Sequence, residues 1–154
     1  MLESRFPIIL HTGFSKMAKK SVVIPILLLL GACGFSGASV TRDEMNIHAA
    51  KLTKLSAAVE AHVRYGNPAP GTSEKDLLKA ATEDQPQLLS DFSAFKLRVL
   101  NQDRHAAVLV CDKDGKRALL EDAGCTGKLE FRHWETNAVP CSFTVSMQEV
   151  CGSR

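Results

Sequence analysis

Four cysteines in the last third of the chain are the side chains best suited to cross-linking or metal chemistry. They are Cys111, Cys125, Cys141 and Cys151, separated in turn by 13, 15 and 9 residues. No C-x-x-C pair is present, so the spacing is unlike that of a four-thiolate zinc site. We therefore expect two disulfides, formed in an oxidising compartment, and no bound metal. Three pairings can be drawn, and the readier closure of short loops favours Cys111–Cys125 with Cys141–Cys151.

Two other sets of residues are weaker candidates for metal ligands. His48 and His62 share one face of an expected helix, but they would lie about 21 Å apart along its axis and cannot share an ion. The stretch Asp112-Lys113-Asp114-Gly115 resembles the start of a calcium loop. Its glycine comes too early, however, and the twelfth position holds Ala123 instead of glutamate. We interpret the stretch as a hairpin turn, and we expect no cofactor.

No residue pattern in the sequence indicates catalysis. A G-x-S-x-G nucleophile turn and a phosphate-binding glycine loop are both missing from the sequence. Glu121 and Asp122 are adjacent in an expected strand, so their carboxylates would point to opposite faces. We therefore expect a protein without enzymatic activity. A small hydrolase is the alternative, in which His105 or His133 would have to meet Asp122 or Glu130 in a cleft.

The tripeptide His133-Trp134-Glu135 is the best candidate for a surface binding patch. It combines an imidazole, the single tryptophan and a carboxylate, and tryptophan is enriched where proteins bind one another. In the alternative interpretation, Trp134 covers the core beneath a loop held by a disulfide.

The elements that would position these residues begin with helices. Thr41-Arg42-Asp43-Glu44 has the form of a capping box. Behind it, residues at three- and four-residue steps predict a helix of about six turns that ends at Gly66: Met45, His48, Leu52, Leu55, Val59 and His62. Two shorter helices are expected, one from Ser73 and one from Pro86.

The second half of the domain has the two-residue period of strands. The expected strands are Phe95 to Val99, Ala106 to Val110, Ala118 to Leu120, Leu129 to Trp134, and Cys141 to Met147. The predicted fold class is therefore α+β: a long N-terminal helix and short helices packed on a small antiparallel sheet of four or five strands.

The N-terminal region has the composition of an export signal. Lys19 and Lys20 precede a short apolar run, Val22 to Leu30, which is too short to span a bilayer as a stable helix. Residues 1–16 do not fit such a signal, so we expect translation to begin at Met17.

The end of this run, Leu30-Gly31-Ala32-Cys33, resembles the lipobox of bacterial lipoproteins. The resemblance implies that Cys33 is acylated and becomes the first residue of the mature protein, and that Gly34 directs it to the outer membrane. An ordinary secreted protein cut after Ala38 is the alternative. The expected organisation is a leader over 1–32 with a signal peptide over 17–32, a lipidated tether over 33–40, and a periplasmic domain over 41–154.

The charge balance excludes a nucleic-acid partner. The formal net charge is +2, but residues 1–32 hold four basic residues and one acidic residue, and the remainder holds 15 basic and 16 acidic residues. A protein without excess positive charge has no electrostatic footprint for a polyanion.

The expected function is therefore that of a non-enzymatic, membrane-anchored periplasmic lipoprotein. It would act as an envelope accessory factor that binds another envelope protein through its sheet edge or the Trp134 region. One alternative is a small-ligand-binding module or an inhibitor of an envelope enzyme, with a pocket between helix and sheet lined by Leu52, Leu55 and Phe143.

Overall fold

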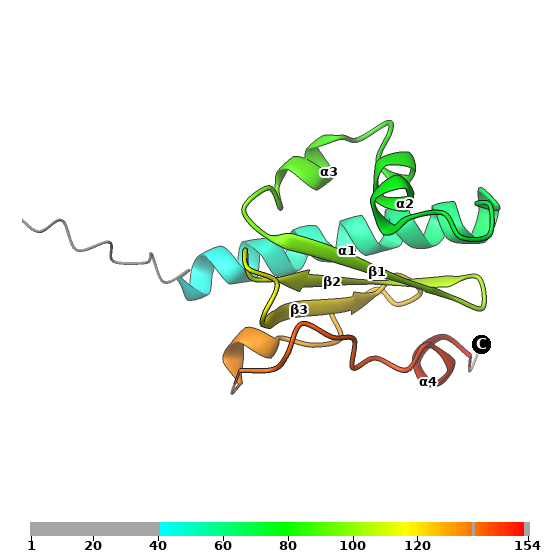
Figure 1. Ribbon diagram of the computed structural model, residues 1–154. Helices are drawn as coiled ribbons and strands as arrows, with labels where there is room; N and C mark the ends of the chain where they lie inside the picture. Colours follow the sequence, from blue (N-terminus) through cyan, green and yellow to red (C-terminus); the bar gives the residue numbers. More distant parts are fainter. Residues whose placement is uncertain (1–40, 137, 153–154) are drawn as a thin grey trace, which may run out of the picture. The chain divides into compact units, whose positions relative to one another are not determined.

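The computed structural model describes residues 41–136 and 138–152 (Figure 1). The chain divides into two units, Met1–Gly37 and Ala38–Arg154, and all described residues belong to the second. The leader, Cys33 and the tether, for which the sequence predicts export and acylation, lie outside the described residues. Within the described part, no helix combines the length and the apolar character needed to cross a membrane.

The helix α1 (Arg42–Tyr65) is 24 residues long and begins at the expected capping box. The N–H of Glu44 donates to Thr41 Oγ1 (3.3 Å), and the N–H of Thr41 donates to Glu44 Oε2 (2.7 Å). The helix ends at Gly66, whose N–H donates to the carbonyl oxygen of His62 (2.8 Å). One face of α1 is buried by residues at three- and four-residue steps: Met45, Ala49, Leu52, Leu55, Val59 and Val63.

Three antiparallel strands follow two short helices, α2 (Glu74–Ala81) and α3 (Gln87–Ser90). They are β1 (Lys96–Gln102), β2 (His105–Cys111) and β3 (Ala118–Ala123), in the spatial order β1-β2-β3. The β1–β2 turn contains Asp103 and Arg104, both with positive φ (55° and 64°), as a tight hairpin turn requires. The β2–β3 turn contains Gly115 with φ 69°.

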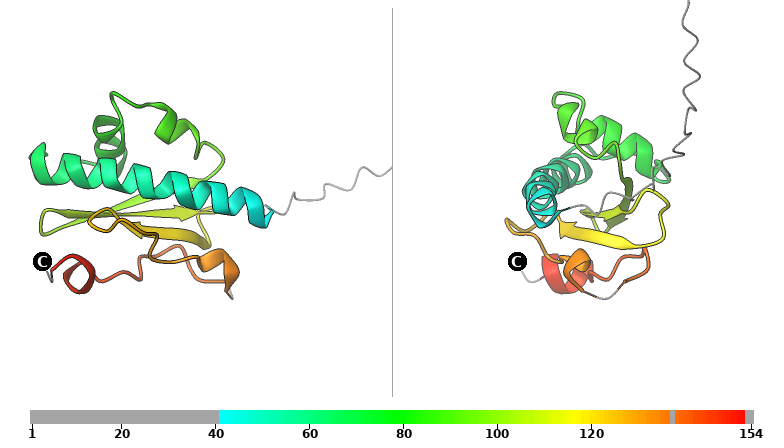
Figure 2. Two further views of the ribbon diagram at one scale, coloured as in Figure 1. Left: turned by 180° about the vertical axis from the view of Figure 1, so that it is seen from behind. Right: turned by 90° about the vertical axis from the view of Figure 1, so that its left-hand side faces the viewer.

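The sheet lies between two layers (Figures 1 and 2). All three of the helices α1, α2 and α3 cover one face. The C-terminal segment, with the 3-10 helix η1 (His133–Glu135) and the short helix α4 (Met147–Cys151), covers the other. The central strand β2 is buried on both faces: Ala106, Val108 and Val110 pack with α1, whereas Ala107, Leu109 and Cys111 pack with the C-terminal segment. The predicted α+β class is confirmed.

The prediction of four or five strands is wrong. Residues 129–134 contain one isolated bridge, Glu121 to Phe131, before η1 begins. Residues 141–147 form no strand, although Val145 and Met147 are buried while Thr144 and Ser146 are exposed. The alternation reflects an extended segment that buries every second side chain against a sheet, which does not require a hydrogen-bonded strand partner.

Two disulfides are present, as expected, but the favoured pairing is wrong. The bonds are Cys111–Cys141 and Cys125–Cys151. Cys111 pairs with Ala118 at one end of β3, whereas Cys125 follows the other end of that strand. The β2–β3 hairpin therefore holds Cys111 and Cys125 apart, and each is joined instead to the C-terminal segment that covers the sheet.

Candidate functional site

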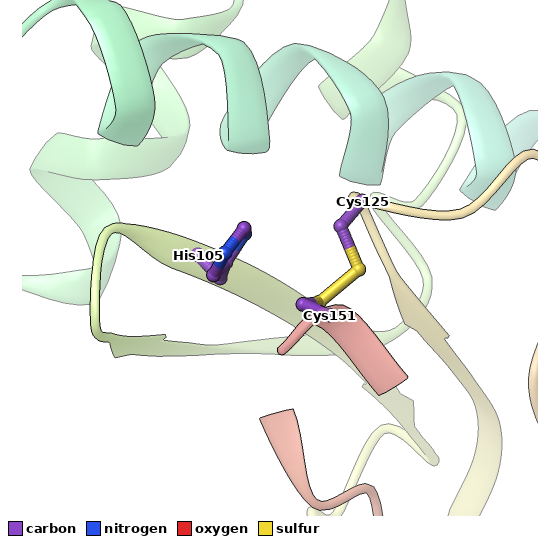
Figure 3. A group of neighbouring side chains, drawn as sticks. All are labelled: His105, Cys125 and Cys151. Carbon is purple, nitrogen blue, oxygen red and sulfur yellow. A yellow bond between two sulfur atoms is a disulfide. The ribbon is translucent and has the colours of Figure 1, made fainter. Parts of the chain in front are cut away.

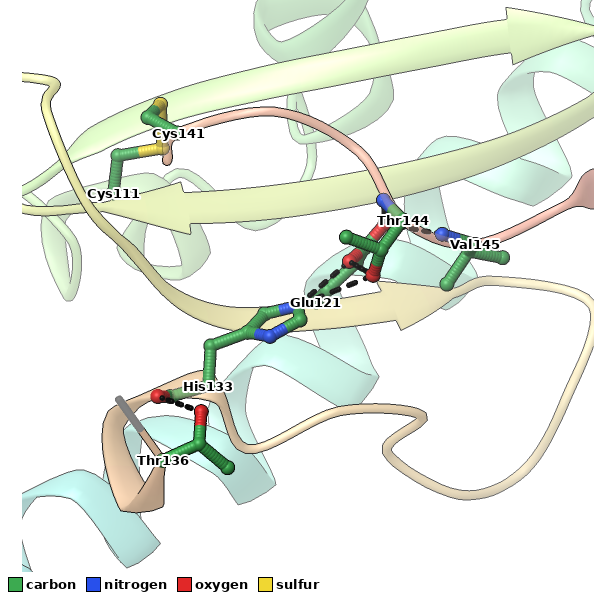
Figure 4. A network of polar contacts seen from close by, with 7 residues as sticks. All are labelled: Cys111, Glu121, His133, Thr136, Cys141, Thr144 and Val145. Carbon is green, nitrogen blue, oxygen red and sulfur yellow. Dashed lines mark hydrogen bonds and ion pairs between the residues drawn. A yellow bond between two sulfur atoms is a disulfide. The ribbon is translucent and has the colours of Figure 1, made fainter. Parts of the chain in front are cut away.

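A buried glutamate, Glu121 of β3, organises the polar contacts on the face of the sheet beneath the C-terminal segment (Figure 4). Its Oε1 accepts from the N–H groups of Thr144 (2.8 Å) and Val145 (2.9 Å). Its Oε2 accepts from the hydroxyl of Thr144 (2.7 Å) and contacts His133 Nε2 (2.8 Å). A buried carboxylate is costly unless it is hydrogen-bonded, and four groups surround this one.

The Glu121–His133–Thr144 cluster does not have the geometry of a catalytic triad. A triad places the carboxylate on one imidazole nitrogen and the nucleophilic hydroxyl on the other. Here Glu121 Oε2 and Thr144 Oγ1 both approach His133 Nε2, at 2.8 and 3.5 Å. The hydroxyl proton is also directed to Glu121. This arrangement fastens the C-terminal segment to β3, and it provides no path for activating the hydroxyl.

The residues of the expected binding patch do not form one exposed surface. His133 is buried, and its ring stacks on that of Phe131 (centroids 5.4 Å apart, interplanar angle 21°). Trp134 is half-buried and packs against the core between α1 and the sheet. Glu135 is exposed and lies near Arg42 (3.5 Å) and Arg132 (3.9 Å). Only part of the tripeptide is therefore accessible to a partner.

Asp122 lies on the opposite face of β3 from Glu121, as neighbouring strand residues should. Its Oδ2 accepts a hydrogen bond from the hydroxyl of Ser56 in α1, and both side chains are fully buried. Burial raises the pKa of Asp122 to about 6; the charge of Glu130 adds to this shift, and the Ser56 hydrogen bond opposes it. The pair is thus a proton-sensitive link between α1 and the sheet.

The contacts required by the hydrolase alternative are not made between the described side chains. His133 contacts Glu121, and His105 Nδ1 contacts Glu60 Oε1 (2.7 Å). The carboxylate of Glu130 accepts from the hydroxyl of Thr126 (2.6 Å). Neither histidine is hydrogen-bonded to Asp122 or Glu130.

A cluster that the sequence did not predict joins His105 to the second disulfide (Figure 3). A nitrogen of His105 and the sulfur atoms of Cys125 and Cys151 lie within 4.8 Å of one another. Glu60 fixes the start of β2, because its Oε2 also accepts from the N–H of Ala106 (2.6 Å). Finding this cluster would have required the correct cysteine pairing, which sequence spacing did not supply.

The two weaker candidates for metal ligands, the His48/His62 set and the Asp112 to Gly115 stretch, make other contacts. His48 packs edge-on against Phe95 (centroids 4.8 Å apart) within the helical layer, far along α1 from His62. Asp112 accepts from the N–H groups of Lys116 (2.7 Å) and Arg117 (3.2 Å). These bonds close the β2–β3 turn, in agreement with the hairpin interpretation.

The three residues that would line a pocket in the small-ligand alternative lie on opposite faces of the sheet. Leu52 and Leu55 are fully buried in the core between α1 and the sheet. Phe143 packs on the other face of the sheet, with the clusters beneath the C-terminal segment. The sheet separates the residues that were expected to line one cavity.

At both edges of the sheet, part of the outward backbone is covered by other segments of the chain. At β1, the outward N–H of Val99 donates to Glu74 Oε2 (3.0 Å). At β3, Glu121 and Phe131 exchange two backbone hydrogen bonds (3.0 and 3.1 Å), and the N–H of Ala118 donates to the carbonyl of Val139 (2.8 Å). Covered edges of this kind oppose the addition of another strand.

An open groove of about 530 Å³ lies between α2, α3 and β1. Its apolar lining comes from Leu78, Leu89 and Leu97. Charged side chains complete the lining: those of Lys75, Lys79 and Lys96, and the ion pair of Arg98 with Glu74 (3.0 Å). A neighbouring hollow of about 430 Å³ shares Lys79 and Leu89 with it. We call the larger of the two hollows, lined by Leu78, Leu89, Leu97 and the three lysines, the lysine groove.

No protein-family model matches the chain, and neither the curated proteins nor the solved structures include a significant match. The lipobox resemblance concerns the leader alone. We therefore infer the role of the domain from its own surface.

Proposed function

We propose that this chain is a membrane-anchored, non-enzymatic periplasmic lipoprotein whose domain binds an acidic segment of another envelope protein in the lysine groove. The observation that carries the proposal is the groove itself, in which apolar side chains line a concave surface and lysines surround it.

The cellular address is supported by two independent features. The first is the lipobox resemblance at Leu30-Gly31-Ala32-Cys33. The second is the presence of two disulfides in the domain, because such bonds persist in oxidising compartments. An acyl anchor on Cys33 would hold the domain at a membrane surface, and several acyl chains make such an anchor durable.

The charges of the groove favour an acidic partner. Within the described part of the chain, Lys75, Lys79 and Lys96 form no ion pair, whereas Arg98 is neutralised by Glu74. Three cations without carboxylate partners attract acidic side chains and raise the rate of encounter. The acids Asp76 and Glu83 line the neighbouring hollow, so the excess of positive charge lies in the hollow lined by Lys75, Lys79 and Lys96.

The shape of the groove favours a segment of protein chain. The two hollows share Lys79 and Leu89 in their linings, so they lie next to each other. An amphipathic segment could place apolar side chains on Leu78 and Leu97 and direct its acidic side chains to the lysines, as in helix-in-groove recognition.

The test is photo-cross-linking in cells, followed by binding measurements. A photoreactive residue in place of Leu89 should capture one envelope protein, whereas one in place of Lys128, on the exposed loop after β3, should not. The cross-linked segment should carry acidic and apolar residues. Its peptide should bind the purified domain, and Lys75→Glu with Lys79→Glu should weaken binding at least about tenfold.

Matched charge reversals control for the net charge. Lys54 and Lys113 are exposed lysines outside the groove, so Lys54→Glu with Lys113→Glu should leave peptide binding nearly unchanged. Capture of a segment without acidic residues, or equal losses in the two double variants, would refute the proposal.

A small amphipathic anion is the second candidate for the groove, because the volume of about 530 Å³ lies within the range of small-molecule sites. Native mass spectrometry of the protein purified from its own membranes distinguishes the two: a bound carboxylate-bearing lipid would favour this candidate.

A further inference from the structure

His105, Cys125 and Cys151 form a compact set of metal-binding side chains at one end of the sheet (Figure 3). They come from three segments: the first residue of β2, the loop after β3, and the last residue of α4. One ring nitrogen and the two sulfur atoms lie within 4.8 Å of one another, with Cys151 buried and the other two residues half-buried.

A carboxylate orients the histidine in this set. Glu60 is buried in α1, and its Oε1 lies 2.7 Å from His105 Nδ1. A carboxylate accepts hydrogen bonds, so with Nδ1 as the donor to Glu60 a neutral imidazole would present its lone pair on Nε2. Metal-binding histidines commonly have a carboxylate on the second ring nitrogen, which fixes the tautomer and increases ligand basicity.

We propose that the reduced Cys125–Cys151 pair and His105 bind a zinc ion. The pair would then exist in two forms, a disulfide or a zinc dithiolate. A phosphine or dithiol reductant supplies the two electrons that cleave the S–S bond. The phosphine takes an oxygen from water to become the phosphine oxide, and that water supplies the two thiol protons; a dithiol gives up its own two protons and becomes a disulfide. Zinc then displaces one proton from each of the two thiols, because the thiolate is the ligand form.

Zinc binding requires only a small movement of the two sulfur atoms away from each other. Two thiolates on one tetrahedral zinc lie roughly 3.7 Å apart, given Zn–S bonds of about 2.3 Å. The Cα atoms of Cys125 and Cys151 are 5.8 Å apart, so side-chain rotation can separate the sulfurs without moving the backbone far. A water molecule can fill the fourth position.

The other disulfide lacks the neighbouring imidazole. Neither Cys111 nor Cys141 belongs to a described group of three metal-binding side chains. Burial does not distinguish the two bonds, because each joins a buried cysteine to a half-buried one. The proposal does not depend on the lysine groove, which lies between α2, α3 and β1.

Zinc competition with a chromogenic chelator tests the proposal on the purified protein. After reduction with a phosphine and confirmation by thiol counting, we expect one zinc ion per chain, and none in the oxidised protein. His105→Ala should weaken zinc binding at least tenfold, and Glu60→Gln by about 10–100-fold. His62→Ala, which changes a half-buried histidine of α1 outside the cluster, should have no effect.

Cobalt and alkylation identify the ligands. Co²⁺ should give a thiolate-to-cobalt charge-transfer band in the reduced protein, and the Cys111→Ala/Cys141→Ala variant should retain it. If that variant does not fold, zinc should still protect Cys125 and Cys151 of the reduced wild type from iodoacetamide. Zinc binding that is absent after complete reduction, equal in the oxidised protein, or unchanged by His105→Ala would overturn the proposal.

Discussion

Ser56 of α1 donates a hydrogen bond to Asp122 of β3, and this contact joins the long helix to the sheet in a fully buried position. Burial raises the pKa of Asp122 from 3.8 to about 6. The folded chain therefore holds this proton more tightly than the unfolded chain does. The stability that Asp122 contributes is complete below pH 3.8 and is lost as the pH rises through about 6.

The Asp122→Asn variant should remove this pH dependence, because the amide stays neutral and can still bond to Ser56. Near pH 8 the variant should be about 1–3 kcal/mol more stable than the wild type, and near pH 4 the two should converge. Urea unfolding across this range measures the difference. Asp114→Asn, on an exposed turn, is the control and should show the same dependence of stability on pH as the wild type. If the stability of Asp122→Asn also changes with pH as that of the wild type does, the prediction is contradicted.

Gly124 allows β3 to approach α1 closely. A Cβ atom at this position would overlap the backbone oxygen of Ser56 and collide with Glu60 Cβ. Gly124→Ala should therefore lower the free energy of unfolding by about 2–3 kcal/mol. Gly127→Ala is the matched control, since no atom lies within 4 Å of its added Cβ. Similar stabilities for the two variants in urea would show that the helix can move away without cost.

Removing the Glu121 carboxylate should release the C-terminal segment locally. In Glu121→Ala the N–H groups of Thr144 and Val145 lose their acceptor, and we expect a cost of about 3–5 kcal/mol. The disulfides keep the segment attached, so amide exchange should increase over residues 140–147 more than in α1. Glu135→Ala removes exposed ion pairs and should cost under about 1 kcal/mol. If amide exchange over residues 140–147 is unchanged in Glu121→Ala, the prediction is contradicted.

The prediction about cellular location concerns Cys33. Cys33→Ser should abolish fatty-acid labelling and move the domain from the membrane fraction to the soluble fraction, because the acceptor thiol is lost. Metabolic labelling followed by fractionation measures both effects. Cys125→Ser, outside the lipobox, should leave labelling intact. Persistent labelling of Cys33→Ser would contradict the lipobox interpretation.

Short sequence patterns correctly predicted the helix cap, the turn and the strand that depend on neighbouring residues. The capping box at Thr41, the turn at Asp112 and the strand over Ala106 to Val110 depend on neighbouring residues, and each is present. The alternating segment Cys141 to Met147 was misassigned, because period-two burial is shared by strands and by extended chain. The N–H groups of Thr144 and Val145 both donate to one carboxylate oxygen of Glu121, a pattern that a hydrogen-bonded strand does not have.

The candidate sites depended on long-range pairing and were less predictable. The lysine groove combines α2, α3 and β1, and no spacing rule relates Lys79 to Lys96. The cluster of His105 with Cys125 and Cys151 requires the pairing that loop length disfavoured. Loop-closure entropy describes an unfolded chain, whereas the rigid β2–β3 hairpin decides which cysteines can meet.

Among the four cysteines of the domain, the first is joined to the third and the second to the fourth, and this interleaved connectivity has a consequence for biogenesis. A polypeptide that crosses a membrane from its N-terminus presents Cys111 and Cys125 before either partner arrives. An oxidase that acts on cysteines in the order in which they emerge would join Cys111 to Cys125, which is not a native pair. Maturation should therefore require either a delay in oxidation until translocation is complete or an isomerase that rearranges this non-native disulfide.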